Sequence, residues 1–125
     1  MKLETLIVGI MPLEQYKKRT IAIAKGEYIP KKDEPKIWFE SLKSMAQILS
    51  SENQELLRII LLNNPQSLKE LEELTGRAKS NLSRTLKTLQ RYGIVNLTKV
   101  KNTIFPEVKA TNFKIEFGLG EETVK

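Results

Sequence analysis

The spacing of apolar residues in the first 40 positions predicts one strand, one helix and a short extended segment. The apolar run within residues 2–10 predicts a strand. Pro12 suits the first position of a helix, and apolar residues follow it at helical spacing as far as Gly26, where the helix is expected to end. A polar linker covers residues 29–35, and the apolar segment at 37–39 is expected to be extended because it follows a proline closely.

Helical spacing dominates from Ser41 to Gly93 and predicts four helices. Serine N-caps are expected at Ser41, Ser51 and Ser67, the last two within capping boxes that read SENQ and SLKE. The apolar residues expected to face the core are Leu42, Met45, Ala46, Leu49, Leu56, Leu57, Ile60, Leu61, Leu68, Leu71, Leu74, Ala78, Leu82, Leu86 and Leu89.

The last two helices and the segment after them form a familiar order of elements. A helix over 68–74 is followed by a tight turn at Gly76 and by a helix over 78–92. Apolar runs after Gly93, joined by a turn at Lys101–Asn102, predict a β-hairpin. This order is typical of a winged helix-turn-helix.

We therefore expect an α+β, mainly α fold, a winged helix-turn-helix with an N-terminal strand–helix appendage. The appendage and its linker would cover residues 1–36, and the DNA-binding domain 37–117. Residues 118–125 would form a C-terminal tail.

The charge distribution indicates the kind of partner that the chain binds. The 125 residues carry 21 Lys and Arg against 15 Asp and Glu, a net charge of +6, which favours a polyanionic partner. Residues 74–106 hold seven of the basic residues and no acidic residue. The helix over 78–92 and the hairpin therefore predict a surface that attracts a nucleic acid backbone.

Polar and basic side chains on the helix over 78–92 stand opposite its leucines. Arg and Lys can hydrogen-bond guanine edges, Asn can bond adenine, and Ser can bond bases or phosphates. The hairpin lysines would contact phosphates or probe the minor groove. The predicted DNA-binding residues are Arg77, Lys79, Ser80, Asn81, Ser83, Arg84, Lys87, Arg91, Lys99 and Lys101.

Residues 53–106 resemble winged helix-turn-helix transcriptional regulators of the broad MarR/ArsR-like type. The resemblance rests on Ser67 to Leu71 (SLKEL), Gly76–Arg77, Asn81 to Arg84 (NLSR), and Gly93 to Val95 (GIV). It implies that the helix over 68–74 braces a recognition helix and that the hairpin is a wing. The wider chain is similar to a small group of predicted bacterial and archaeal DNA-binding regulators that are often encoded beside small toxin-like proteins.

Two functions follow as expectations. The first is a sequence-specific transcriptional regulator of double-stranded DNA, acting as a homodimer because one short helix reads only a few base pairs. The N-terminal strand and helix, or a C-terminal strand over 114–117, would join the two copies. The alternative, implied by the resemblance alone, is an antitoxin-type protein that neutralises a neighbouring toxin and regulates its own promoter. A winged helix that binds RNA or a protein is a third interpretation.

Other chemistry finds little support in the sequence. There is no cysteine and no histidine, so thiolate and imidazole sites are excluded, and we expect neither an enzyme nor a metal or cofactor. No apolar run reaches the roughly 20 residues that span a bilayer, so we expect a cytoplasmic protein without membrane contact. Trp38 and Phe39 are expected in the core, and the basic run 17–19 on a solvated helix face.

Overall fold

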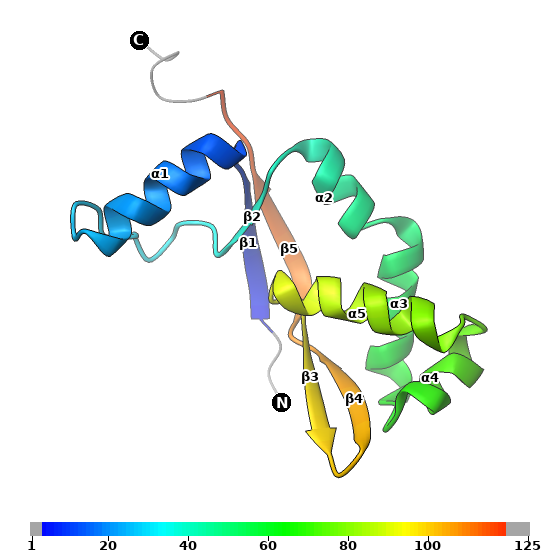
Figure 1. Cartoon of the computed structure of the whole chain (residues 1–125). Helices are drawn as coiled ribbons and strands as arrows, with labels where there is room; N and C mark the ends of the chain where they lie inside the picture. Colours follow the sequence, from blue (N-terminus) through cyan, green and yellow to red (C-terminus); the bar gives the residue numbers. More distant parts are fainter. Residues whose placement is uncertain (1–3, 120–125) are drawn as a thin grey trace. The chain divides into compact units, whose positions relative to one another are not determined.

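The structure, a computed structural model, describes residues 4–119 and contains five helices and five strands in that range (Figure 1). The helices are α1 (Leu13–Ala24), α2 (Leu42–Ile48), α3 (Ser51–Asn63), α4 (Leu68–Thr75) and α5 (Lys79–Arg91). The strands are β1 (Glu4–Ile10), β2 (Ile37–Phe39), β3 (Val95–Val100), β4 (Thr103–Val108) and β5 (Ala110–Glu116). The chain divides into two compact units.

Unit 1 consists of residues 46–111 with Glu4 and holds most of the core. In it α4 packs on α3 and on α5, and all three helices pack on the antiparallel hairpin of β3 and β4 (Figure 1). The side chains that fill its interior are buried to 9% exposure or less: Leu56, Leu57, Ile60, Leu68, Leu71, Leu82, Leu86, Leu89, Ile94, Val95, Val108 and Ala110. Burial of each leucine contributes about 1.5–3 kcal/mol, so this core fixes the orientation of the three helices.

Unit 2 consists of residues 5–45 and the described residues from 112 onward. Its sheet has the strand order β2-β1-β5, and β1 pairs parallel with β2. The pairing aligns Val8 with Ile37 and Ile10 with Phe39, and the N–H of Met11 donates to the carbonyl of Phe39 at 2.9 Å. A connection between parallel strands needs a crossover, which α1 provides.

The prediction of a winged helix-turn-helix with an N-terminal appendage is wrong, although the α+β class is confirmed. β1 is the central strand of the three-stranded sheet, flanked by β2 and β5. A central strand must satisfy its N–H and C=O groups on both edges, and the partners come from residues 37–39 and 110–116, far along the chain. Periodicity over 2–10 predicts the strand correctly for residues 4–10, and residues 2 and 3 lie outside the described range. It carries no signal for those distant partners.

Most helix boundaries agree with the predictions to within one residue. Pro12, expected at the first helical position, is instead the N-cap of α1, and the helix predicted over 78–92 is α5, which covers Lys79–Arg91. The hydroxyl of Ser41 accepts from the N–H of Ser44 at 3.1 Å, and that of Ser67 accepts from the N–H of Glu70 at 3.0 Å, as expected for N-caps. The cap predicted at Ser51 is instead Ser50, which accepts from the N–H of Asn53 at 3.2 Å. Consecutive serines compete for the same role, and the one that precedes the first helical residue takes it.

Five of the residues predicted to face the core lie on the surface instead. Leu61 is 40% exposed and Leu74 41%, because each lies at the margin of the apolar stripe of its helix. The N-cap Ala78 is exposed, and so are Leu42 and Ala46 on α2, a helix without any buried side chain.

Within residues 4–119, none of the helices combines the length and the apolar character that a membrane span requires.

Candidate nucleic-acid interface

Helix α5 is oriented by three leucines that have no solvent exposure. Leu82, Leu86 and Leu89 are each 0% exposed and face the interior of unit 1. Positions spaced by four, three and four residues share a helix face, and one such row lies opposite the leucines. That row consists of Ser80, Arg84, Lys87 and Arg91, and all four side chains are exposed. We refer to these four residues as the α5 outer face.

The other predicted contacts on α5 flank this face. At about 100° per residue, Asn81 and Ser83 lie on the two sides of the helix between the outer face and Leu82, and Lys79 lies closer to the leucine stripe. Asn81 and Lys79 are exposed, whereas Ser83 is half-buried. Asn81 therefore remains a candidate for contact with a base. Ser83 is better placed for a contact with DNA at the margin of the interface.

A carboxylate from outside the basic stretch 74–106 lies at the N-terminus of α5. An oxygen of Glu72, on α4, accepts a hydrogen bond of 3.3 Å from the backbone N–H of Lys79. Negative charge at a helix N-terminus stabilises the helix. The basic stretch 74–106 contains no acidic residue, but the fold brings one to its edge from outside it.

Arg77 has a structural contact that the sequence did not indicate. Its guanidinium donates to the backbone carbonyl of Glu52 on α3 at 2.9 Å, across 25 residues of chain. Its own N–H donates to the hydroxyl of Thr75 at 3.1 Å. These bonds fix the turn between α4 and α5, where Gly76 adopts a φ of 75°. Arg77 is therefore engaged within unit 1 in addition to any contact with a ligand.

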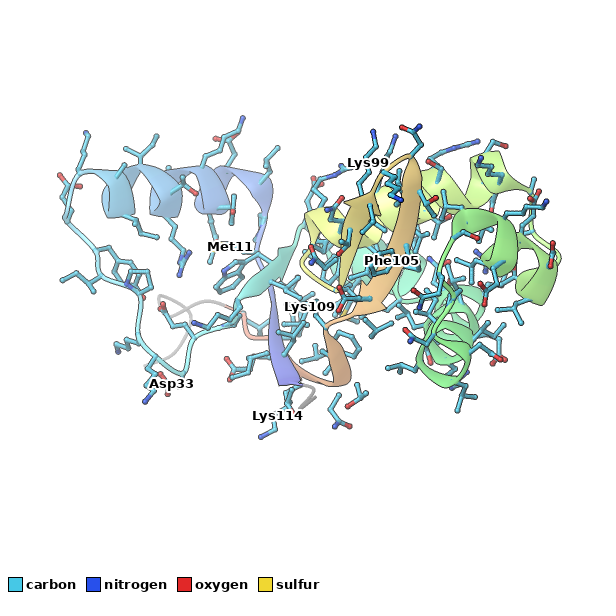
Figure 2. The ribbon with its side chains drawn as sticks, turned by 90° about the horizontal axis from the view of Figure 1, so that it is seen from below. Met11, Asp33, Lys99, Phe105, Lys109 and Lys114 are labelled. Carbon is cyan, nitrogen blue, oxygen red and sulfur yellow. The ribbon has the colours of Figure 1, made fainter. Side chains whose placement is uncertain are left out.

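The β3–β4 hairpin carries the two remaining predicted lysines. Lys99 pairs with Ile104, and Val100 with Thr103, which leaves Lys101 and Asn102 as the two turn residues. Figure 2 shows Lys99 near the hairpin tip. Both lysines are exposed. The turn predicted from Lys101–Asn102 is confirmed, but the residue with positive φ is Lys101, at 57°, a conformation that disfavours most side chains with a Cβ.

None of the seven cations in this region forms an ion pair with another described residue. The two ion pairs found in residues 4–119 join Arg19 to Glu34 and Arg58 to Glu55. The structure places all ten predicted residues in unit 1, on α5, the turn before it and the hairpin that packs against it. Cations that are not in an internal ion pair can attract an external polyanion.

The basic residue Arg19 has a different role. Its guanidinium lies 5.1 Å from the ring centre of Trp38 and 5.6 Å from that of Tyr28, and it pairs with Glu34 at 3.1 Å. Glu34 also accepts from the hydroxyl of Tyr28. Arg19 is thus part of a cluster that fixes the linker onto α1, whereas Lys17 and Lys18 are exposed. Phe39 is fully buried, as expected, and Trp38 is half-buried.

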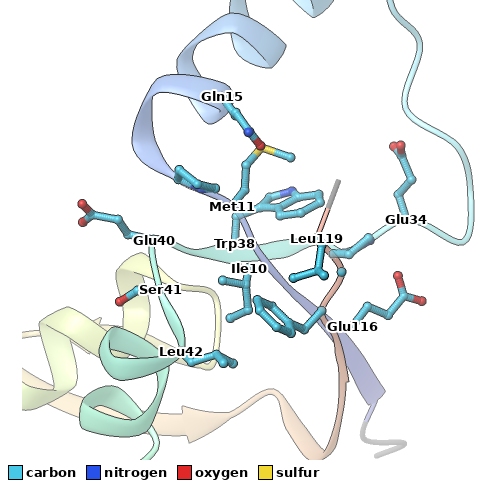
Figure 3. Close-up of a pocket in the computed structure, with 14 residues that line it drawn as sticks. Ile10, Met11, Gln15, Glu34, Trp38, Glu40, Ser41, Leu42, Glu116 and Leu119 are labelled. Atoms are coloured by element: carbon cyan, nitrogen blue, oxygen red, sulfur yellow. The ribbon is translucent and has the colours of Figure 1, made fainter. Parts of the chain in front are cut away.

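Unit 2 also contains an open groove of about 1190 Å³ (Figure 3). Its lining is largely apolar and includes Ile10, Met11, Trp38, Phe117 and Leu119. Met11 and Trp38 lie next to one another in the close-up. None of the predicted DNA-binding residues lines this groove. Across residues 4–119, no group of three or more carboxylate, imidazole or thiol side chains is arranged to hold a metal ion.

Comparison with known proteins gives one match. Residues 48–115, more than half of the chain, match the model of the protein family HVO_A0114. No curated protein and no solved structure matches the chain. The matched range includes all ten predicted residues.

Proposed function

We propose that this chain, which belongs to the HVO_A0114 family, is a sequence-specific transcriptional regulator that binds double-stranded DNA. α5 lies in the major groove, and the tip of the β3–β4 hairpin contacts the sugar–phosphate backbone beside it. The observation that carries the proposal is the α5 outer face, on which three cations and a serine are exposed and none of the cations is paired within the described chain.

The dimensions of α5 suit this role. Thirteen residues extend about 20 Å at 1.5 Å per residue, and a helix with its side chains is about 10–12 Å in diameter. The major groove of B-form DNA is about 12 Å wide and admits one such helix. The leucines hold the opposite side of α5 against unit 1, so a rigid element presents the outer face.

The side chains supply two kinds of contact. Arg84 can donate two hydrogen bonds to a guanine edge, and Asn81 can exchange two with adenine. Ser80, Lys87 and Arg91 are suited to phosphate contacts along the groove wall. Lys99 and Lys101 reach the backbone from the hairpin, so their contribution is independent of sequence.

Regulation of transcription requires more base pairs than one helix can read. A single recognition element covers only a few base pairs, and specific sites are therefore bound by two copies at two half-sites about 34 Å apart. The proposal accordingly includes a homodimer on a symmetric operator.

Fluorescence anisotropy with labelled duplex DNA, duplex RNA and single-stranded DNA of one length tests the proposal. We expect duplex DNA to bind most tightly, because the deep, narrow major groove of A-form RNA excludes a helix. Arg84→Ala should lower affinity for duplex DNA, whereas Arg58→Ala should not, since Arg58 is already paired with Glu55 on α3. Equal binding of all three nucleic acids would leave only non-specific attraction and refute a regulator of this type.

A further inference from the structure

We infer that β5 joins two copies of this chain into a dimer, by antiparallel pairing with the β5 of a second copy in a register centred on Ile115. The inference deepens the proposed function and rests on it for the expectation of a homodimer, since it assigns the surface that joins the two copies. The assembly forms without nucleic acid, so it is tested without DNA. Four observations on unit 2 support it.

The first observation is the uneven distribution of apolar side chains between the units. Among the described residues, unit 2 contains eight of the twelve large apolar side chains that are exposed, but only three of the fifteen apolar residues that are buried. Single exposed apolar residues are normal on a protein surface. Three of the eight, Ile115, Phe117 and Leu119, lie on β5 or within three residues after it, next to the edge where the second copy would pair.

The second observation is the position of β5 at the edge of its sheet. In the order β2-β1-β5, β5 has β1 on one side and no described strand on the other. An edge strand of seven residues is a template for a further strand, and proteins commonly block such edges with proline or with a charged side chain. β5 contains no proline, and its blocking charge is Lys114, labelled in Figure 2.

The third observation is that β5 also contains Glu116, whose negative charge can neutralise Lys114 of a second copy. A two-fold axis perpendicular to the sheet and midway between the two copies of Ile115 places Lys114 opposite Glu116 of the second copy, and Glu116 opposite Lys114. Both side chains are exposed, and neither is in an ion pair within the described residues. Opposite charges that face one another across a strand pair stabilise it, and like charges destabilise it.

Neighbouring registers lack this complementarity. A register centred on Lys114 places two lysines opposite each other, and one centred on Glu116 does the same with two glutamates. A register centred on Phe113 places Glu116 opposite Ala110 and leaves it without a cation. The sequence of β5 thus selects one symmetric pairing.

The fourth observation is the apolar face of the same strand. Alternation places Phe113, Ile115 and Phe117 on the face opposite Lys114, with Phe117 directly after the end of the strand. Ile115 is 49% exposed and Phe117 56%. In the register centred on Ile115, Phe113 lies beside Phe117 of the second copy twice, and the two isoleucines lie beside each other. The pairing therefore buries part of this apolar surface in cross-strand contacts.

Sedimentation equilibrium of the full chain at low salt, without DNA, tests the inference. We expect the natural chain to dimerise, and Lys114→Glu and Glu116→Lys each to weaken the dimer about tenfold or more, because each change places like charges opposite one another twice. The double variant Lys114→Glu/Glu116→Lys should regain the natural affinity. Lys109→Glu, the same charge change at an exposed lysine just before β5, should leave the dimer unchanged.

An equimolar mixture of the two single variants provides a second measurement. At these two positions the Lys114→Glu chain carries only acidic side chains and the Glu116→Lys chain only basic ones, so opposite charges face one another in a mixed pair. The mixture should therefore form a heterodimer of near-natural affinity even though neither variant dimerises well alone. Such a heterodimer also shows that both variants fold.

Three outcomes would each overturn the inference. They are a natural chain that remains monomeric at about 100 μM, a double variant that stays weak, and a mixture that does not associate. None of these outcomes bears on DNA binding by a single copy.

Discussion

The carboxylate of Glu72 accepts a hydrogen bond of 3.3 Å from the backbone N–H of Lys79, the first residue of α5. A negative charge is therefore held at the end of the helix that is proposed to approach a polyanion. The same charge interacts favourably with the helix dipole. The contact thus stabilises α5 and opposes DNA binding at the same time.

We expect Glu72→Gln to separate these two effects. Loss of the charge should lower the free energy of unfolding by about 0.3–1 kcal/mol, because the helix dipole loses its partner. Affinity for duplex DNA should rise by a few-fold at low salt, since repulsion of the phosphates is removed. Thermal denaturation and anisotropy titrations measure the two changes. Glu73→Gln, a charge change on the exposed neighbour, should alter affinity less; equal gains in both variants would mean that the position of Glu72 is unimportant.

The hairpin tip shows a similar conflict between stability and binding. Lys101 has a φ of 57°, which costs roughly 1–2 kcal/mol for a residue with a Cβ and almost nothing for glycine. Lys101→Gly should therefore raise the free energy of unfolding by about 1 kcal/mol. It should also weaken binding to all DNA sequences alike and reduce the salt slope of the binding constant by about one.

Lys99→Gly is the matched comparison, because Lys99 lies in β3 with Ile104 as its partner. Glycine in a strand interior is destabilising, so this variant should lose both stability and affinity. If Lys101→Gly also lowers the stability, the strained turn is not the source of the expected gain.

The sheet of unit 2 is sensitive at Gly9. A Cβ added there would lie 2.5 Å from a ring carbon of Trp38 and 2.9 Å from the ring of Pro35, so one of these rings would have to move. Gly9→Ala should therefore destabilise the chain by about 1–3 kcal/mol in chemical denaturation. Gly118→Ala, where no atom lies within 4 Å of the added Cβ, should be close to neutral. A neutral result at Gly9 would mean that Trp38 is free to shift.

The sequence was most informative where local chemistry decides the structure. The first residues of α2, α3 and α4 follow from serine caps, and the end of α4 follows from a glycine with positive φ. The buried stripe of α5 follows from the spacing of its three leucines. The orientation of the α5 outer face could therefore be predicted before any coordinates. The competition between Ser50 and Ser51 shows the limit of such signals, since both serines fit the pattern and only one caps the helix.

Contacts between distant residues could not be predicted in this way. The pairing of β1 with β2 and β5 is set by packing over the whole chain, and the resemblance to a winged helix-turn-helix gave no indication of it. Similarly, Arg77 bonds the carbonyl of Glu52, and Glu72 reaches the N–H of Lys79, through the way α3, α4 and α5 pack. A count of charges along the chain does not contain this information.

Selection of bound duplexes from a random pool, with the natural chain and with Arg84→Ala in parallel, tests most directly whether the α5 outer face reads DNA. For the natural chain we expect a defined symmetric sequence. For Arg84→Ala we expect relaxed preference at one position in each half-site and a loss of about 1–3 kcal/mol on the selected duplex. An unchanged selected sequence and unchanged affinity in the variant, or no enrichment by the natural chain, would contradict the account.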